Sequence, residues 1–153
     1  MKIDGFQGEH RFLSNFWPAP VVYDGQKYPS VEFAYQAAKT LDRHERLFIL
    51  ACDKPGQAKK IGKSLTLRPG WDDMKLAVME KLVRQKFTRH ENLKAMLVAT
   101  GDAELVETNA WGDVFWGVCD GKGENHLGKI LMKVREEFRP RADLQIKNFK
   151  ETP

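Results

Sequence analysis

The sequence predicts an α+β fold, a mostly α-helical single domain with a few short strands. Apolar residues recur at helical spacing over residues 72–89 and again over 125–138. Short β-branched and aromatic runs flank the pair Asp24-Gly25, which is typical of a tight hairpin turn. The 153 residues are enough for one domain with a sizeable core, and neither a linker nor an internal repeat divides them.

The first elements follow from turn and capping signals. We expect short strands and turns over residues 3–28, with Val21–Tyr23 and Gln26–Tyr28 forming the hairpin. Ser30 can then cap the amides of a helix that runs to about Leu41.

The next elements are two short helices and a loop. Asp42 followed by Glu45 has the spacing of a capping box, Pro55 suits the first turn of a helix, and Gly62 suits its end. The expected elements are a helix over 43–51, a helix over 55–62 and a loop over 64–71.

The second half of the chain contains the longest predicted helix, at 72–89. Its apolar residues form two neighbouring rows, so this helix is expected at the centre of the core. The rows are Met74, Val78, Leu82 and Met79, Val83, Phe87. The remaining predictions are a helix over 91–100, strands over 104–108 and 114–116, a helix over 125–138 that Asn125 could cap, and a tail from Arg139 without a strong pattern.

Composition indicates an ordinary globular protein, with 42% hydrophobic and 30% charged residues. The net charge of +4 is compatible with phosphate-bearing ligands or weak nucleic-acid attraction and requires neither. Cys52 and Cys119 lack metal-ligand spacing, which favours a reduced intracellular protein. The start has no apolar signal segment and no stretch approaches a membrane span, so a cytoplasmic location without membrane contact is expected.

Three polar side chains share a face of the first predicted helix. Glu32, Gln36 and Lys39 are spaced i, i+4 and i+7. Glu32 falls in the first turn, where the helix terminus favours an ionised carboxylate by roughly 0.3–1 kcal/mol. Such a carboxylate suits the activation of water or the stabilisation of a cation, although a simply solvated helix face has the same spacing.

The stretch from Gly56 to Ser64 resembles a phosphate-binding P-loop without matching it. Five residues separate its glycines where the motif has four, and the stretch falls within a predicted helix. We therefore exclude nucleotide hydrolysis of that type, although Lys59, Lys60 and Lys63 could form a basic rim near a phosphate. The four histidines are scattered and no Gly-x-Ser-x-Gly elbow occurs, so neither a metal nor a cofactor is expected.

A second informative stretch covers residues 109–128, where two Trp-Gly steps bracket an acid and a glycine-rich turn leads into a helix. Glycines let backbone amides approach an anion, and a helix start adds partial positive charge. A plain hairpin before a helix explains the same glycines. Trp71, placed in a Pro-Gly loop, is a candidate stacking platform, whereas Trp111 and Trp116 are more typical of core residues.

Three segments together resemble a known family. They are Phe12-Leu-Ser-Asn-Phe16, Ser30-Val-Glu-Phe-Ala-Tyr-Gln-Ala-Ala-Lys39, and Trp116-Gly followed by Gly121-x-Gly-x-Asn-x-Leu-Gly-Lys-Ile-Leu-Met132. In order and spacing they resemble the NADAR (NAD and ADP-ribose related), or YbiA-like, N-glycosidase family. The likeness runs from about residue 6 to residue 138, and the tail over 139–153 lies outside it.

The resemblance implies a compact helical domain over residues 1–153 that cleaves N-glycosidic bonds. In relatives the substrates include ADP-ribosyl groups on guanine and early phosphorylated intermediates of riboflavin synthesis. Matched to the family motifs, Glu32 and Asp113 would be catalytic. The residues that would bind the substrate are Trp71, Lys39, Asn15, Arg11, Trp116, Gly117 and Asn125, of which Arg11 only adjoins a matched motif.

The implied reaction passes through an oxocarbenium-like centre at the anomeric carbon. Glu32 would stabilise this centre and orient the attacking water, while Asp113 would hold the ribose hydroxyls or the departing base. Trp71 would stack on that base, and Lys39 with nearby lysines would contact phosphates.

The expected partner is a phosphate-bearing small molecule or an ADP-ribosylated nucleotide or DNA, and no obligate protein partner is indicated. Two alternatives remain: a non-catalytic module that binds ADP-ribose or NAD, and a nucleic-acid-binding protein.

Overall fold

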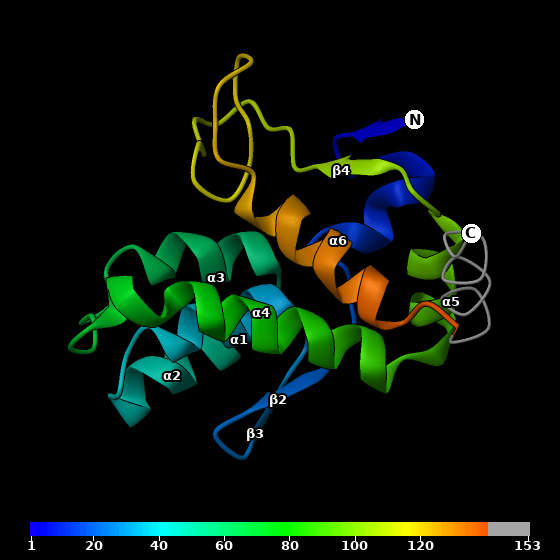
Figure 1. Ribbon diagram of the computed structural model, residues 1–153. Coiled ribbons are helices and arrows are strands. Elements are labelled where there is room, and N and C mark those ends of the chain that lie inside the picture. The colour runs from blue at the N-terminus through cyan, green and yellow to red at the C-terminus, as the bar shows by residue number, and fades with distance from the viewer. Residues whose placement is uncertain (141–153) are drawn as a thin grey trace, which may run out of the picture.

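Helices make up about half of the computed structural model, which describes residues 1–140 (Figure 1). The α-helices are α1 (Val31–Ala38), α2 (Arg43–Leu50), α3 (Pro55–Gly62), α4 (Trp71–Arg89), α5 (Glu91–Ala99) and α6 (His126–Glu137). The strands are β1 (Lys2–Asp4), β2 (Val21–Tyr23), β3 (Gln26–Tyr28) and β4 (Glu104–Val106), and a 3-10 helix, η1, covers Gly8–Leu13. The predicted α+β class is confirmed, while most of the predicted tail lies outside the described residues.

The predicted hairpin is confirmed. β2 pairs with β3 antiparallel, with Val21 opposite Tyr28. Asp24 and Gly25 connect the strands with φ of 47° and 77°. Both values are left-handed, which Gly adopts without strain and Asp tolerates, and this backbone twist suits a two-residue hairpin.

Helix α1 lies in the interior of the fold. All eight of its residues are buried, and it packs against α2, α3 and α4 (Figure 1). The helix begins as predicted, because the Ser30 hydroxyl accepts a hydrogen bond from the amide of Phe33 at 3.5 Å. It ends at Ala38, short of the predicted Leu41.

The predicted N-cap of α2 is confirmed, but the capping box is not. Asp42 Oδ1 accepts a hydrogen bond from the amide of Glu45 at 3.0 Å. The amide of Asp42 donates to Thr40 Oγ1 at 3.1 Å, so it does not require the Glu45 carboxylate. That carboxylate accepts instead from the amide of Thr66 at 2.8 Å, which ties the loop after α3 back to α2.

Helix α4 provides much of the core, as predicted. Five of the six residues in the two apolar rows are buried and Met74 is partly buried. The pattern did not indicate that Lys86 is also buried, at 1% exposure. Its Nζ donates to the carbonyls of Phe12 at 2.6 Å and Ser14 at 2.9 Å, which fastens the segment after η1 to α4.

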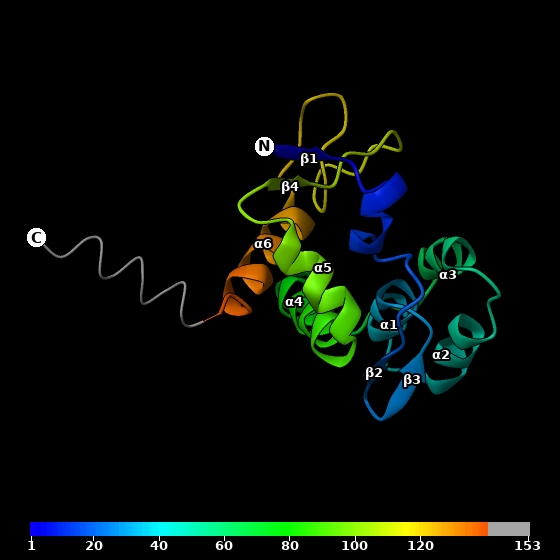
Figure 2. The same cartoon turned by 90° about the vertical axis from the view of Figure 1, so that its right-hand side faces the viewer.

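The N-terminal strand β1 pairs in parallel with β4, a pairing that the sequence did not predict. Ile3 of β1 lies opposite Leu105 of β4, and α6 packs against β4. Figure 2 shows this pair on the far side of the helices from the hairpin. The predicted strand over 104–108 is confirmed in its first three residues.

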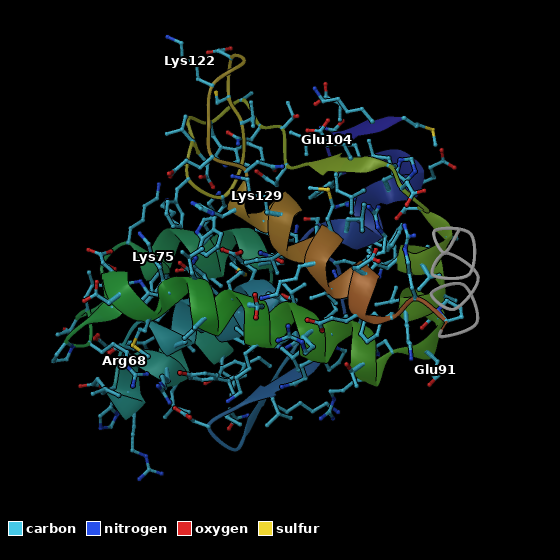
Figure 3. All side chains as sticks on the ribbon, in the orientation of Figure 1. Arg68, Lys75, Glu91, Glu104, Lys122 and Lys129 are labelled. Atoms are coloured by element: carbon cyan, nitrogen blue, oxygen red, sulfur yellow. The ribbon has the colours of Figure 1, made fainter. Side chains whose placement is uncertain are left out.

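Between β4 and α6 the chain forms a long irregular segment over residues 107–125, here called the 107–125 segment. Lys122 projects from its outer part (Figure 3). The predicted strand over Val114–Trp116 is wrong. Asp113 Oδ1 accepts hydrogen bonds from the amides of Phe115 at 3.1 Å and Trp116 at 2.9 Å, and these bonds hold the backbone in a turn despite its β-forming side chains.

Candidate active site

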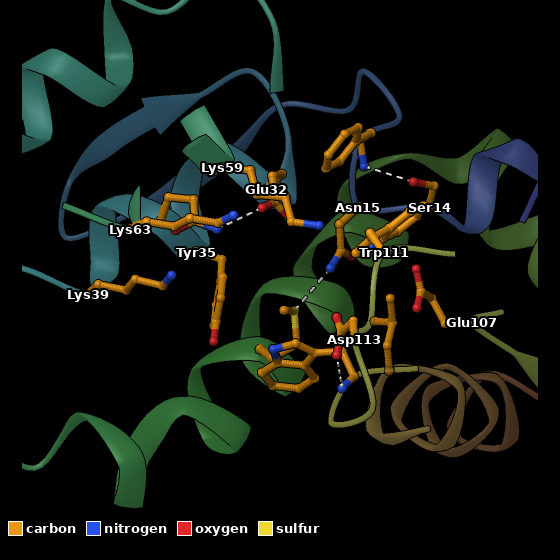
Figure 4. Close-up of a pocket in the computed structure, with 15 residues that line it drawn as sticks. Ser14, Asn15, Glu32, Tyr35, Lys39, Lys59, Lys63, Glu107, Trp111 and Asp113 are labelled. Carbon is orange, nitrogen blue, oxygen red and sulfur yellow. Dashed lines mark hydrogen bonds between the residues drawn. The ribbon is translucent and has the colours of Figure 1, made fainter. Parts of the chain in front are cut away.

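A cavity of about 220 Å³ lies between α1, α3 and the 107–125 segment. Its walls contain three carboxyl groups, three lysines and several aromatic rings (Figure 4). The lining residues are Ser14, Asn15, Phe16, Glu32, Tyr35, Gln36, Lys39, Lys59, Lys63, Met79, Glu107, Trp111, Asp113, Trp116 and Leu127. Groups of both charges, drawn from segments distant in sequence, therefore converge on one cavity.

The polar face predicted for α1 lines this cavity. Glu32, Gln36 and Lys39 all contribute to the wall, and Gln36 Nε2 donates to Glu32 Oε1 at 2.7 Å. The amide of Glu32 donates to the carbonyl of Asn15 at 3.1 Å. Gln36 thus holds the carboxyl group of Glu32, and the segment after η1 holds its backbone.

The helix start favours the ionised form of Glu32, but its burial acts in the opposite direction. Burial raises the pKa of Glu32, and this effect exceeds the lowering by the Gln36 hydrogen bond and by the charges of Lys59 and Lys39. Stabilisation by a helix terminus, roughly 0.3–1 kcal/mol, is small beside the desolvation of a carboxylate. A positive charge that develops beside Glu32 would favour its carboxylate form.

The basic wall comes from α1 and α3. Lys59 and Lys63 lie one helical turn apart in the stretch that resembles a P-loop, and Lys39 follows α1 directly. Burial lowers the pKa of Lys39, although the nearby Glu32 raises it. Two lysines of the predicted basic rim thus line the cavity, whereas Lys60 is exposed and lies outside it.

The turn that replaces the predicted strand holds Asp113 at the cavity. Asn109 Oδ1 accepts from the amide of Asp113 at 3.0 Å, and Asn109 Nδ2 donates to the Asp113 carbonyl at 2.8 Å. The Oδ1 atom of Asp113 is occupied by two backbone amides. Since no hydrogen bond from residues 1–140 reaches Oδ2, that oxygen is left for a ligand.

Aromatic rings form one side of the cavity. Tyr35 and Trp116 meet edge to face, with centroids 5.5 Å apart. Trp111, which the sequence suggested as a core residue, is 62% exposed. Its ring lies 4.7 Å from Lys59 Nζ, so Trp111 offers a ring face at the edge of the cavity.

Trp71 is not in the predicted position. It begins α4 and is only 5% exposed. Its ring packs on Tyr35, with centroids 5.4 Å apart, and it is not among the lining residues. In this structure Trp71 packs behind Tyr35, a lining residue, and does not itself line the cavity.

Three other predicted substrate-binding residues also lie outside the cavity. Arg11 is exposed and lines a neighbouring cavity with Trp17 and Lys54. Gly117 is buried, and because it has no side chain, Glu107 and Asn109 can pack directly against its backbone.

Asn125 occupies the N-cap position of α6, but its side chain makes no capping hydrogen bond. Its side chain donates to the carbonyl of Leu105 at 3.0 Å and accepts from the amide of Glu107 at 2.9 Å. These two bonds hold the start of α6 against β4. The structure therefore places Glu32, Asp113, Lys39, Asn15 and Trp116 at one cavity, and the other four predicted residues lie outside its lining.

Glu107 and Tyr35 are lining residues that the sequence did not single out. Tyr35 belongs to the same helix as Glu32, one turn away, so the spacing could have suggested it. Glu107 lies within the predicted strand over 104–108, and a single acid in that position gives no signal of burial.

Neither a metal site nor a membrane-spanning helix is found in the described part of the chain. Within residues 1–140, no group of three His, Cys, Asp or Glu side chains is arranged to hold a metal ion. Among the helices of these residues, none combines the length and the apolar composition needed to cross a membrane.

Comparison with known proteins identifies close relatives. The family model described as NADAR domain matches residues 5–139. The N-glycosidase YbiA of Escherichia coli is 41% identical over 129 residues, which cover 82% of this chain and 80% of that protein. A riboflavin biosynthesis protein of Vibrio vulnificus is 38% identical over 143 residues, covering 92% of this chain but only 39% of that longer protein. The NMR structure of Escherichia coli YbiA superposes with a TM-score of 0.77 at 35% identity, covering 100% of this chain and 89% of the other.

Proposed function

The chain belongs to the NADAR domain family and is a glycosyl hydrolase of the N-glycosidase type, and on this premise we propose that it hydrolyses the bond between a ribose and a base in an ADP-ribosyl or phosphoribosyl compound. Candidate substrates are ADP-ribosyl-guanine and phosphorylated intermediates of riboflavin synthesis. The name of the Vibrio vulnificus relative supports the second class.

One observation carries this proposal: a buried carboxyl group shares a small cavity with three lysines. Glu32 is buried in the wall, and Lys39, Lys59 and Lys63 surround the same space. A carboxylate suits a sugar carbon that becomes cationic, and ammonium groups suit phosphates. A phosphorylated ribose presents both requirements in one molecule.

In the proposed reaction Glu32 acts on the anomeric carbon. As the ribose–nitrogen bond lengthens, positive charge develops on that carbon and favours the ionised form of Glu32. The carboxylate then accepts a proton from the attacking water. At about 4 Å and an effective dielectric constant near 20, the charge interaction amounts to roughly 4 kcal/mol.

The remaining cavity residues would position the substrate. Asp113 Oδ2 is available to the ribose hydroxyls, because Oδ1 is held by the backbone. Asn15 and Trp116 complete the wall around the ribose. Trp111 takes the stacking role first assigned to Trp71, since its ring is exposed at the cavity.

The proposal is tested by following base release from a substrate panel. The panel contains an oligonucleotide with ADP-ribosyl-guanine, free NAD and phosphorylated flavin precursors. Glu32→Gln keeps the shape of the side chain and removes the charge, so we expect a loss of about 1,000-fold in kcat, from roughly 4 kcal/mol at about 1.4 kcal/mol per decade. Glu9→Gln, at an exposed position, is the matched control.

Wild-type activity on a panel member together with a folded, inactive Glu32→Gln variant supports the proposal. Tight binding of ADP-ribose without any turnover over hours would favour the binding module. Undiminished base release by Glu32→Gln with a native melting curve would refute the role of Glu32.

We also propose that residues 1–153 act as one domain in the cytoplasm. The family model spans residues 5–139, which supports the single domain. Cys52 and Cys119 are both free thiols, which supports a reducing compartment.

A further inference from the structure

Glu107 is a cavity carboxyl group to which the mechanism above gives no role. It follows β4 and lines the same cavity as Glu32 and Asp113. In Figure 4 its side chain lies at the opposite end of the view from Lys39 and Lys63. If those lysines hold the phosphates of a substrate, the base at the far side of the ribose lies toward Glu107.

The position of Glu107 is fixed by its neighbours. Its amide donates to Asn125 Oδ1 at 2.9 Å, and its carbonyl accepts from the amide of Val118 at 2.9 Å. Asn109 Nδ2 donates to Oε2 of the carboxyl group at 3.2 Å. Gly117 provides the space, because a Cβ at that position would overlap both the carboxyl group and the carbonyl of Glu107. The close packing holds the side chain in a single orientation.

The surroundings also set the proton affinity of this group. Burial raises the pKa of Glu107 to about 7. The Asn109 hydrogen bond and Lys59 lower it, while Asp113 and Glu32 raise it. A substantial fraction of Glu107 is therefore protonated at neutral pH, whereas an exposed glutamic acid would be almost fully ionised. A proton donor works best when its pKa is near the working pH.

We propose that Glu107 is the general acid that protonates the departing base, an inference that rests on the proposed N-glycosidase function. The anomeric carbon–nitrogen bond breaks, its electron pair goes to the base nitrogen, and that nitrogen receives the proton of Glu107. The water oxygen bonds to the anomeric carbon, and its proton passes to Glu32. The products are a ribose with a free anomeric hydroxyl and a neutral base. Exchange with solvent then returns a proton to Glu107 and removes one from Glu32.

The test compares pH profiles of wild type and Glu107→Gln on the ADP-ribosyl-guanine or flavin-precursor substrate that the wild-type protein cleaves, because the nicotinamide of NAD departs as a neutral base without a proton. The amide keeps the hydrogen bond from Asn109 but cannot donate an acidic proton. We expect kcat to fall by about 100- to 10,000-fold with little change in KM. Because the acid must be protonated, wild-type activity should decline as pH rises through about 7, and this decline should be missing in Glu107→Gln. Glu107→Asp should restore part of the lost kcat and also the decline of activity as pH rises through about 7.

Glu104→Gln, at an exposed position of β4, is the matched control and should behave as wild type. The inference is overturned if Glu107→Gln keeps wild-type kcat, or if it loses activity while the decline near pH 7 persists. If the wild-type protein releases no base from any panel member, the proposed function itself fails. The two failures are therefore distinguishable.

Discussion

Gly62 is expected to control activity without contacting the substrate. It is the last residue of α3 and lies against the side chain of Gln36, whose amide donates to Glu32 Oε1 at 2.7 Å. A Cβ at position 62 would lie 2.6 Å from Cδ of Gln36 and would overlap its Oε1. In Gly62→Ala the amide group of Gln36 must therefore move, and its hydrogen bond to Glu32 is lost.

The magnitude follows from the two effects of the added methyl group. Alanine favours a helix over glycine by about 1 kcal/mol in the interior and by less at the end, so unfolding free energy should change by less than about 1 kcal/mol. A hydrogen bond to a charged group contributes about 1.5–3 kcal/mol. At about 1.4 kcal/mol per decade, kcat/KM should fall roughly 10- to 100-fold. Since the Gln36 bond lowers the pKa of Glu32, its loss should also shift the acid limb of the pH profile to higher pH.

The assay is base release by purified variants, with urea unfolding as the measure of stability. Gly56→Ala is the matched control, because it lies in the same helix and a Cβ there meets no atom of the described residues within 4 Å. In a Gln36→Ala background, Gly62→Ala should have no further effect on kcat/KM. Equal activity of the Gly62 and Gly56 variants, or additive losses in the double variant, would show that Gly62 does not act through Gln36.

Two further predictions concern Lys86 and Trp111. Burial lowers the pKa of Lys86 to about 7, below about 10.4 in the unfolded chain, so between these values the unfolded state binds the extra proton and stability rises with pH. Urea titrations of wild type and Lys86→Met should therefore show that the wild-type unfolding free energy increases, relative to the variant, by up to about 1.4 kcal/mol per pH unit above about pH 7. A difference between the two unfolding free energies that stays constant with pH would contradict this. Trp111→Ala should raise KM on the order of tenfold, because about 1–3 kcal/mol of stacking on the base is lost. The melting temperature should not change, because the ring is 62% exposed. An unchanged KM would show that Trp111 does not bind the base.

Local signals account for what the sequence predicted well. The shared face of Glu32, Gln36 and Lys39 follows from helical periodicity alone, and the structure places all three at the cavity. The cap by Asp42 and the Asp24-Gly25 turn likewise depend on a few adjacent residues. Such features can be predicted because they are determined by residues close together in the sequence.

The errors arise where distant or competing groups decide the outcome. The strand over Val114–Trp116 was predicted from its β-forming side chains. The amides of Phe115 and Trp116 instead donate to the Asp113 carboxylate, so they do not take part in strand pairing. Trp71 looked like an exposed loop residue, yet its contact with Tyr35 buries it. The burial of Glu107 could not be predicted, because it depends on tertiary packing around a single acid.

The parallel pairing of β1 with β4 has a consequence for the order of assembly. β4 is held in place when residue 104 pairs with residue 2. The segment that carries Glu107 and Asp113 follows β4, so its position depends on this pairing. Contacts of such long separation form late, after helical neighbours such as α4 and α5 have associated. We therefore expect the cavity wall that carries Glu107 and Asp113 to be completed late in folding, after the helices have associated.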